Sequence, residues 1–207
     1  VQLAGAGFDS PDASGRITLR NVVPGHFLAA RWASADAIVL FSATLQPPDY
    51  YQALLGLPAH TRHLDLPSPF RAEQLDVRVV PVSTRRDLRA HSLDTLADTM
   101  AAQYRARRGN YLAFFSSFDY MEQSAARLRQ RCPEIALWLQ ARQMDEAARR
   151  DFLDQFGHAG AGIGFAVLGG VFGEGVDLPG ARLIGAFIAT LGLPQFDPVN
   201  EAIRARM

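Results

Sequence analysis

Residues 164–194 read GFAVLGGVFGEGVDLPGARLIGAFIATLGLP, and their pattern decides the fold. Two apolar runs, residues 165–168 and 183–188, have the composition of buried strands and flank a loop rich in glycine. Glycine permits positive φ angles and lets backbone amides come close to a ligand. The loop also carries Glu174 and Asp177, whose carboxylates are expected to face water or a partner. Taken alone, the glycines favour a simple turn between two elements.

The composition is that of an ordinary globular protein. The chain has 207 residues, of which 48% are hydrophobic, enough for one sizeable core. Its 21 basic and 21 acidic residues give zero formal net charge, so the overall balance favours neither a nucleic-acid nor a membrane partner. All of the basic residues are arginine. Without lysine the chain holds no P-loop lysine and no lysine general base, which excludes a complete P-loop ATPase.

Cysteine and hydropathy exclude further classes. Cys132 is the single cysteine, so this chain forms no internal disulfide and no cysteine-rich metal cluster, and we predict a small buried side chain. No apolar run reaches about 18 residues and no signal-peptide pattern opens the chain, so we expect a cytoplasmic protein without a membrane partner. Residues 1–15 are rich in small and polar types and predict a flexible lead-in.

Apolar runs alternate with helical patterns along the chain, which predicts an α/β fold with a mostly parallel sheet flanked by helices. Strands are predicted at residues 37–41, 77–82, 111–115, 135–139, 163–168 and 183–188, with a weak edge strand at 17–23. Helices are predicted at residues 26–34, 47–55, 92–108, 116–131, 145–156 and from 197 onward. We expect Gly56 to end the second helix and Ser116 to cap the fourth.

Three polar or glycine-rich elements each come directly after an apolar run. They are residues 42–44, residues 116–117 and residues 173–177. In a parallel sheet the carboxyl ends of the strands meet at one edge, where ligands bind. Hydroxyls, backbone amides and helix N-termini suit phosphate oxygens, so this pattern predicts a site for a phosphorylated ligand.

Two other ligand classes fit the sequence less well. Gly160, Gly162 and Gly164 come before an apolar run, and the later glycines reverse the G-x-G-x-x-G order, which argues against NAD or FAD. His60 and His63 lie in a proline-rich loop without a second ligand cluster, so no metal site is predicted.

Nucleophilic and acid–base chemistry are also weaker interpretations. Ser42 or Ser116 as a nucleophile would need a histidine base nearby, whereas a capping or phosphate-contacting role needs none. Glu174 and Asp177 lie three residues apart on a loop, a spacing that fixes no acid–base geometry. Hydrogen bonding to a ribose or to loop amides is the better interpretation of the two carboxylates.

From about residue 16 to its end, the chain resembles the C-terminal RecA-like motor domain of the XPD/DinG-type superfamily 2 DNA helicases. Residues 41–45, Phe-Ser-Ala-Thr-Leu, resemble motif III of that family. Residues 114–122, Phe-Phe-Ser-Ser-Phe-Asp-Tyr-Met-Glu, resemble motif IV, and residues 173–178, Gly-Glu-Gly-Val-Asp-Leu, resemble motif V. A Leu-Gly-Leu-Pro turn follows at residues 191–194.

The resemblance implies a three-layer RecA-like (P-loop NTPase-like) domain over residues 16–207, working as part of an ATP-dependent DNA helicase. It assigns nucleotide contact to Gly173, Glu174, Gly175 and Asp177, coupling of nucleotide state to DNA to Ser42, Ala43 and Thr44, and nucleic-acid contact to Ser116, Ser117 and Phe118. Phe118 stands where the family often has tyrosine, so it lacks a hydroxyl but keeps a ring that can stack on a base.

The resemblance also implies what this chain lacks. In that family the P-loop, the acidic Mg²⁺-binding motif and any iron–sulfur cysteines belong to the first motor domain, and motif VI would follow residue 207. We therefore expect a fragment with no complete catalytic set and no ATPase activity of its own. ATP and Mg²⁺ would be shared with an N-terminal motor domain, single-stranded DNA would be the substrate, and only the longer protein could hold an iron–sulfur cluster.

Two alternatives from other classes remain. One is a non-catalytic RecA-like scaffold that docks other proteins. The other is a phosphate or nucleotide-sugar enzyme built on a similar sheet, which a specific small ligand would stabilise.

Overall fold

The computed structural model describes residues 21, 23–85, 87–157, 160–173, 175–190, 201 and 204–205. The chain divides into two compact units, residues 1–75 with 194–207 and residues 76–193. The predicted lead-in at residues 1–15 lies outside the described residues, as do nearly all of the predicted edge strand at 17–23 and most of the helix from 197.

The first unit contains a pair of short helices that the sequence predicts. They are α1 (Gly25–Ala33) and α2 (Pro48–Leu55), and a 3₁₀ turn, η1 (Ala72–Gln74), follows. Gly56 ends α2 in the left-handed conformation, with a φ of 62°. The indole Nε1 of Trp32 donates a 2.7 Å hydrogen bond to the Leu55 carbonyl. A Cβ on Gly25 would lie only 2.7 Å from the Gly56 nitrogen, so the two backbones approach as closely as glycine allows.

Two predicted strands are absent from the described structure, and these predictions are wrong. Residues 37–41 form no strand, and the side chains of Val39 and Phe41 are 81% and 91% exposed. Residues 77–82 are also without strand pairing, and Val79 is 88% exposed. An apolar run becomes a strand only when a neighbouring strand pairs with its backbone groups, and no described segment does so for either run.

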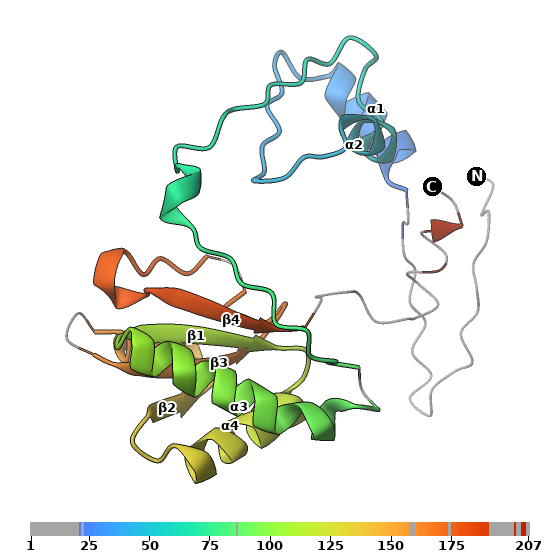
Figure 1. The fold of residues 1–207 in the computed structure, drawn as a ribbon. Coiled ribbons are helices and arrows are strands. Elements are labelled where there is room, and N and C mark those ends of the chain that lie inside the picture. Colours follow the sequence, from blue (N-terminus) through green and yellow to red (C-terminus); the bar gives the residue numbers. More distant parts are fainter. Residues whose placement is uncertain are drawn as a thin grey trace. The chain divides into compact units, whose positions relative to one another are not determined.

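The second unit is an α/β domain with a single parallel sheet (Figure 1). Its elements are α3 (Arg89–Ala106), β1 (Asn110–Phe115), α4 (Phe118–Arg131), β2 (Ala136–Leu139), α5 (Glu146–Asp154), β3 (Gly162–Val167), the 3₁₀ turn η2 (Gly180–Arg182) and β4 (Gly185–Ala189). The four strands lie in the order β2-β3-β1-β4, and every neighbouring pair is parallel. No described helix is long and apolar enough to cross a membrane.

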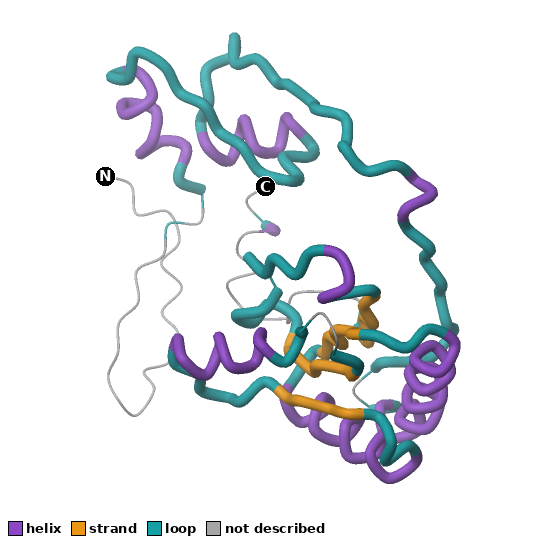
Figure 2. Tube along the Cα trace, turned by 90° about the vertical axis from the view of Figure 1, so that its left-hand side faces the viewer, coloured by secondary structure: helices purple, strands orange, loops and turns teal. Residues whose placement is uncertain are grey.

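Side chains of the central strands alternate between two hydrophobic cores. Residues 111, 113 and 115 of β1 pack with α3 and α4 on one face of the sheet. Residues 112 and 114 pack on the other face with Phe152 and Phe156 of the α5 region. Figure 2 shows helices on both sides of the strands. The sheet is therefore the middle of three layers, which confirms the predicted RecA-like α/β class.

Glycines in β3 serve packing. A Cβ on Gly162 would lie 2.3 Å from Cζ3 of Trp138, and one on Gly164 would lie 2.5 Å from Cζ of Phe156. Two large aromatic rings therefore occupy the space beside β3, where any larger side chain would clash with them. This packing explains why positions 162 and 164 are glycine although they lie in the strand and not in the glycine-rich loop.

The N-cap of the fourth predicted helix lies one residue later than expected. Ser117, not Ser116, is the N-cap of α4, and its hydroxyl accepts a 3.4 Å hydrogen bond from the Tyr120 amide. The prediction that Ser116 caps this helix is wrong because another side chain binds its hydroxyl. Asp145 caps α5 in the same manner, accepting a 2.8 Å bond from the Ala148 amide.

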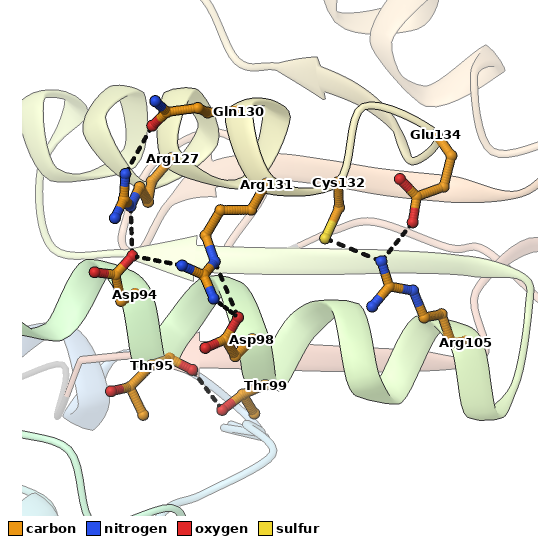
Figure 3. Close-up of polar contacts among 10 residues, drawn as sticks. All are labelled: Asp94, Thr95, Asp98, Thr99, Arg105, Arg127, Gln130, Arg131, Cys132 and Glu134. Carbon is orange, nitrogen blue, oxygen red and sulfur yellow. Dashed lines mark hydrogen bonds and ion pairs between the residues drawn. The ribbon is translucent and has the colours of Figure 1, made fainter.

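Ion pairs join the outer surfaces of α3 and α4 (Figure 3). Arg127 donates to Asp94, and Arg131 donates to Asp98 at 2.6 Å. The hydrogen bond from Arg127 is the main cause that holds the pKa of Asp94 below its ordinary value.

Cys132 follows α4 and is buried, as predicted. Arg105 reaches its sulfur at 3.3 Å and the Glu134 carboxylate at 2.6 Å (Figure 3). The hydrogen bond from Arg105 lowers the pKa of Glu134. The single thiol is therefore covered by α3 and held beside an ion pair.

Candidate functional site

The carboxyl ends of three strands are level with one another. Phe115 of β1 pairs with Val167 of β3 and with Ala189 of β4. The amide of Leu168 donates a 2.8 Å hydrogen bond to the Phe115 carbonyl, which continues the pairing one step into the loop. The loops that begin at Ser116 and Leu168 therefore leave the sheet side by side, as the sequence predicts for a parallel sheet.

The glycine-rich loop after β3 is held at two buried anchors. The ring of Phe172 stacks on that of Phe152, with centroids 4.4 Å apart, and Leu178 packs in the same core. Between the anchors Gly173, Gly175 and Asp177 are exposed. The loop thus presents its middle to solvent while its ends are fixed in the core.

Gly175 adopts a left-handed backbone conformation that glycine allows more readily than other residues. Its φ is +71°, which lies in the left-handed region, and a Cβ placed there would meet nothing within 4 Å. Space above the backbone is therefore open at this position, as close approach of a ligand requires. Glu174 lies outside the described residues.

The Asp177 carboxylate is available for a ligand. It is exposed, and it makes no hydrogen bond or ion pair with any described residue. Some surface carboxylates of the unit, such as Asp94 and Asp98, are paired with arginines, whereas Asp177 is not paired with any described residue. Asp177 combines an anchored backbone with an unpaired charge.

The three residues predicted to contact nucleic acid are all engaged within the protein. Ser116 accepts a hydrogen bond from Arg89, and Ser117 caps α4. Phe118 is partly buried against the core, and the Arg142 guanidinium lies 5.1 Å from its ring centroid. The two serine hydroxyls and the Phe118 ring are therefore already in contact with other residues of the protein.

Arg89 and Gln140 are site residues that sequence reasoning missed. Arg89 lies at the start of α3, far along the chain from the loop it reaches. Gln140 follows β2 directly, and its Oε1 accepts a 2.9 Å hydrogen bond from the Val167 amide. A signal for Gln140 was present, since it is a polar residue directly after an apolar strand, as Ser116 is.

Residues 42–44 lie in the first unit, in a turn without a preceding strand. The Thr44 amide donates a 3.4 Å hydrogen bond to the Ser42 hydroxyl, and all three residues are exposed. Their predicted place beside the sheet edge stays a prediction.

The described residues fit part of a nucleotide site. Open glycine backbone and a free carboxylate are groups that bind phosphate and ribose. Among the described residues no group of three His, Cys, Asp or Glu could hold a metal ion. A Mg²⁺ ion would therefore need ligands from outside them, and the chain has no lysine for the phosphates.

The second unit thus defines a RecA-like domain with an open loop at the carboxyl edge of its sheet. The sequence matches the family model described as the helicase C-terminal domain over residues 100–207, more than half of the chain. The chain belongs to this family, that of the C-terminal helicase domain of XPD/DinG-type helicases, as the motifs predicted. The matched residues include all four strands and the glycine-rich loop. No curated protein matches the sequence.

Proposed function

We propose that this chain is part of an ATP-dependent DNA helicase of the DinG type. The glycine-rich loop forms one wall of a cleft for ATP, and the loop after β1 lies along single-stranded DNA. Membership of the helicase C-terminal domain family supports the helicase origin. The unpaired carboxylate of Asp177, on a loop fixed at Phe172 and Leu178, is the observation that carries the nucleotide role.

The nucleotide would be bound from both sides of the cleft. On this side the backbone of Gly175 is open to a phosphate group, Glu174 would have a supporting role, and Asp177 accepts hydrogen bonds from a ribose. The Gly173 amide already donates a 2.9 Å hydrogen bond to the Gly170 carbonyl, so Gly173 would act by shaping the loop. On the other side an N-terminal motor domain would provide the lysine that this chain lacks. ATP bound with Mg²⁺ would be the substrate, and hydrolysis of its terminal phosphate would drive the motor.

The DNA strand would follow the start of α4. This helix N-terminus faces the carboxyl edge, where backbone amides and the positive end of the helix dipole attract phosphate. Ser116 and Ser117 keep the loop in shape through their bonds to Arg89 and the Tyr120 amide. Ser42, Ala43 and Thr44 would couple closure of the cleft to movement along the strand.

Replacing Asp177 tests the nucleotide role. In the full-length protein we expect Asp177→Ala to lower the DNA-stimulated ATPase rate by about tenfold or more, since an interaction with bound nucleotide is lost. Asp151→Ala on α5 is the matched control, because Asp151 is also exposed and forms no ion pair with a described residue. An Asp177→Ala protein with the wild-type rate would overturn the nucleotide role.

The 207-residue chain alone separates the proposal from its alternatives. We expect no ATPase activity, and weak binding to single-stranded DNA that salt suppresses. Fluorescence anisotropy at low and high salt measures this binding. No binding at either salt concentration would favour a protein-docking scaffold, and specific thermal stabilisation by a nucleotide sugar would favour the phosphate enzyme.

A further inference from the structure

A second polar site lies beside β2, between the residues that follow this strand and Val171 at the start of the glycine-rich loop. A hollow of about 310 Å³ opens there, lined by Gln140, Arg142, Gln143, Met144, Arg149 and Val171 among others. Two arginines and two glutamines contribute to its wall, whereas the lining includes no acidic side chain. The composition favours a ligand that accepts hydrogen bonds.

Gln140 contributes an amide donor to this hollow. Its side chain is only 7% exposed, and the bond from the Val167 amide to Oε1 fixes which way the amide group is oriented. The Nε2 group, left free by that orientation, donates to no described residue. It lies 3.2 Å from the position of a Cβ on Gly170, so glycine there leaves room at the amide.

Arg149 adds a second donor without a strong partner. Its Nε is buried and has no hydrogen-bond partner among the described residues. One terminal nitrogen lies 3.9 Å from the Glu146 carboxylate, a distance that is long for a charge-assisted hydrogen bond. The guanidinium therefore keeps most of its donors for a ligand.

Arg142 contributes a charge that can change partners. It donates to Asp119 at 2.5 Å and lies 3.4 Å from Glu122, and the bond to Asp119 raises its pKa. Both acidic side chains are at least half exposed, and exposed pairs of this kind contribute little to stability. A phosphodiester, whose single negative charge is shared by two oxygens, could therefore take over part of the arginine's hydrogen bonds.

We infer that this hollow binds a phosphate group of the single DNA strand, with Gln140, Arg142 and Arg149 as donors. The inference rests on the proposed function, because Phe118 and Arg142 place the hollow next to the start of α4, where the strand is proposed to run. A phosphodiester also matches the donor set, since it offers acceptors only.

Binding of a labelled oligothymidylate to the 207-residue chain, measured by anisotropy over a range of salt, tests this inference. We expect Arg149→Gln to weaken binding about tenfold at low salt. The slope of log affinity against log salt should become shallower by about 0.7, the value for one phosphate contact on a single strand. Arg150→Gln is the matched control, because Arg150 lies on the same helix, is exposed and is not part of the hollow.

Gln140→Glu is a second variant that keeps the structural hydrogen bond. The carboxylate can still accept from the Val167 amide, but it replaces the free donor with a negative charge, so we expect weaker strand binding at unchanged thermal stability. Equal losses in Arg149→Gln and Arg150→Gln would overturn the inference, because charge alone would then explain them.

Further arms separate the possible failures. If the wild-type chain binds the oligothymidylate and Arg149→Gln binds it equally well, only this inference is overturned. If the wild-type chain does not bind the oligothymidylate at all, the proposed role in strand binding is overturned as well. ATP or inorganic phosphate could raise the melting temperature of the wild-type chain but not that of Arg149→Gln, while both chains bind the DNA strand equally well. That result would assign the hollow to a nucleotide and overturn the inference.

Discussion

The guanidinium of Arg89 donates a 2.7 Å hydrogen bond to the hydroxyl of Ser116, the first residue after β1. The same side chain donates to the Thr84 carbonyl at 3.2 Å and lies 4.9 Å from the centroid of the Tyr120 ring. One arginine thus joins the segment before α3, the end of the central strand and the first turn of α4. These contacts hold the loop after β1, whose sequence resembles motif IV of the XPD/DinG-type helicases.

Removing this arginine should loosen the loop. We expect Arg89→Met to lower the free energy of unfolding by about 1–3 kcal/mol, since it loses two hydrogen bonds and the contact with Tyr120 but keeps the apolar stem. Urea denaturation measures the change. Arg85→Met is the control, because Arg85 is mostly exposed and its pair with Asp87 spans 3.7 Å, and an equal loss there would contradict the role of Arg89.

The anchor at Phe172 should govern the stability of the glycine-rich loop. Phe172→Ala leaves a cavity beside Phe152, and we expect a loss of about 3–5 kcal/mol in the free energy of unfolding. Phe172→Leu keeps most of the volume and should lose less than half as much. Hydrogen exchange of the amides at residues 173–177 should rise in Phe172→Ala, and unchanged exchange there would show that the anchor does not hold the loop.

Two glycines should respond differently to alanine. Gly162→Ala would place a Cβ 2.6 Å from the Ala136 carbonyl oxygen, a backbone atom that cannot move freely, so we expect a loss of about 3 kcal/mol or more. Gly175→Ala meets no atom and costs only the positive φ angle, about 1 kcal/mol. Thermal melts of both variants test whether Gly162→Ala loses more stability than Gly175→Ala. A larger loss in Gly175→Ala would contradict this prediction, because strain in the loop would then outweigh packing in the strand.

Acid should weaken the contact between α3 and α4. Arg127 lowers the pKa of Asp94, so this pair stabilises the fold above the unfolded-state pKa of about 3.9, and the contribution is lost as pH falls through the lower folded-state pKa. We expect the urea concentration at the unfolding midpoint to decrease when the pH is lowered below about 4. In Asp94→Asn this decrease with pH should be less steep. Asp151→Asn is the control, and the same reduction of slope in both variants would contradict the assignment.

The sequence predicted the parts of the fold that depend on local pattern. The runs at 111–115 and 163–168 became β1 and β3 because apolar neighbours on both faces bury them. The run at 183–188 became β4, which pairs with β1 and packs Phe187 and Ala189 into the core on one face while Ile188 stays exposed. The end of α2 at Gly56 followed from the conformational freedom of glycine. Residues 37–41 have the same apolar character, yet pattern alone does not say whether a neighbouring strand pairs with a run.

The candidate site could be predicted only in part for a related reason. The position of residues 173–177 at the sheet edge follows from strand order and loop composition. The bond from Arg89 to Ser116 joins residues 27 positions apart, and the one between Gln140 and Val167 spans the same separation. Such contacts depend on how α3 and β2 pack, which no local pattern records.

The side chain of Gln140 imitates a peptide group. β2 ends at Leu139, which pairs with Phe165, whereas β3 continues to Val167. The Gln140 amide oxygen takes the place that the carbonyl of another strand residue would have held, so the last Val167 amide is satisfied without any more main chain. The backbone is thereby released from the sheet two residues early, and its departure creates the recess beside the strand ends. Glutamate at position 140 could still accept the hydrogen bond from the Val167 amide, so the backbone would leave the sheet at the same residue. Leucine at position 140 would leave the Val167 amide unpaired and would favour a longer β2 that fills the recess.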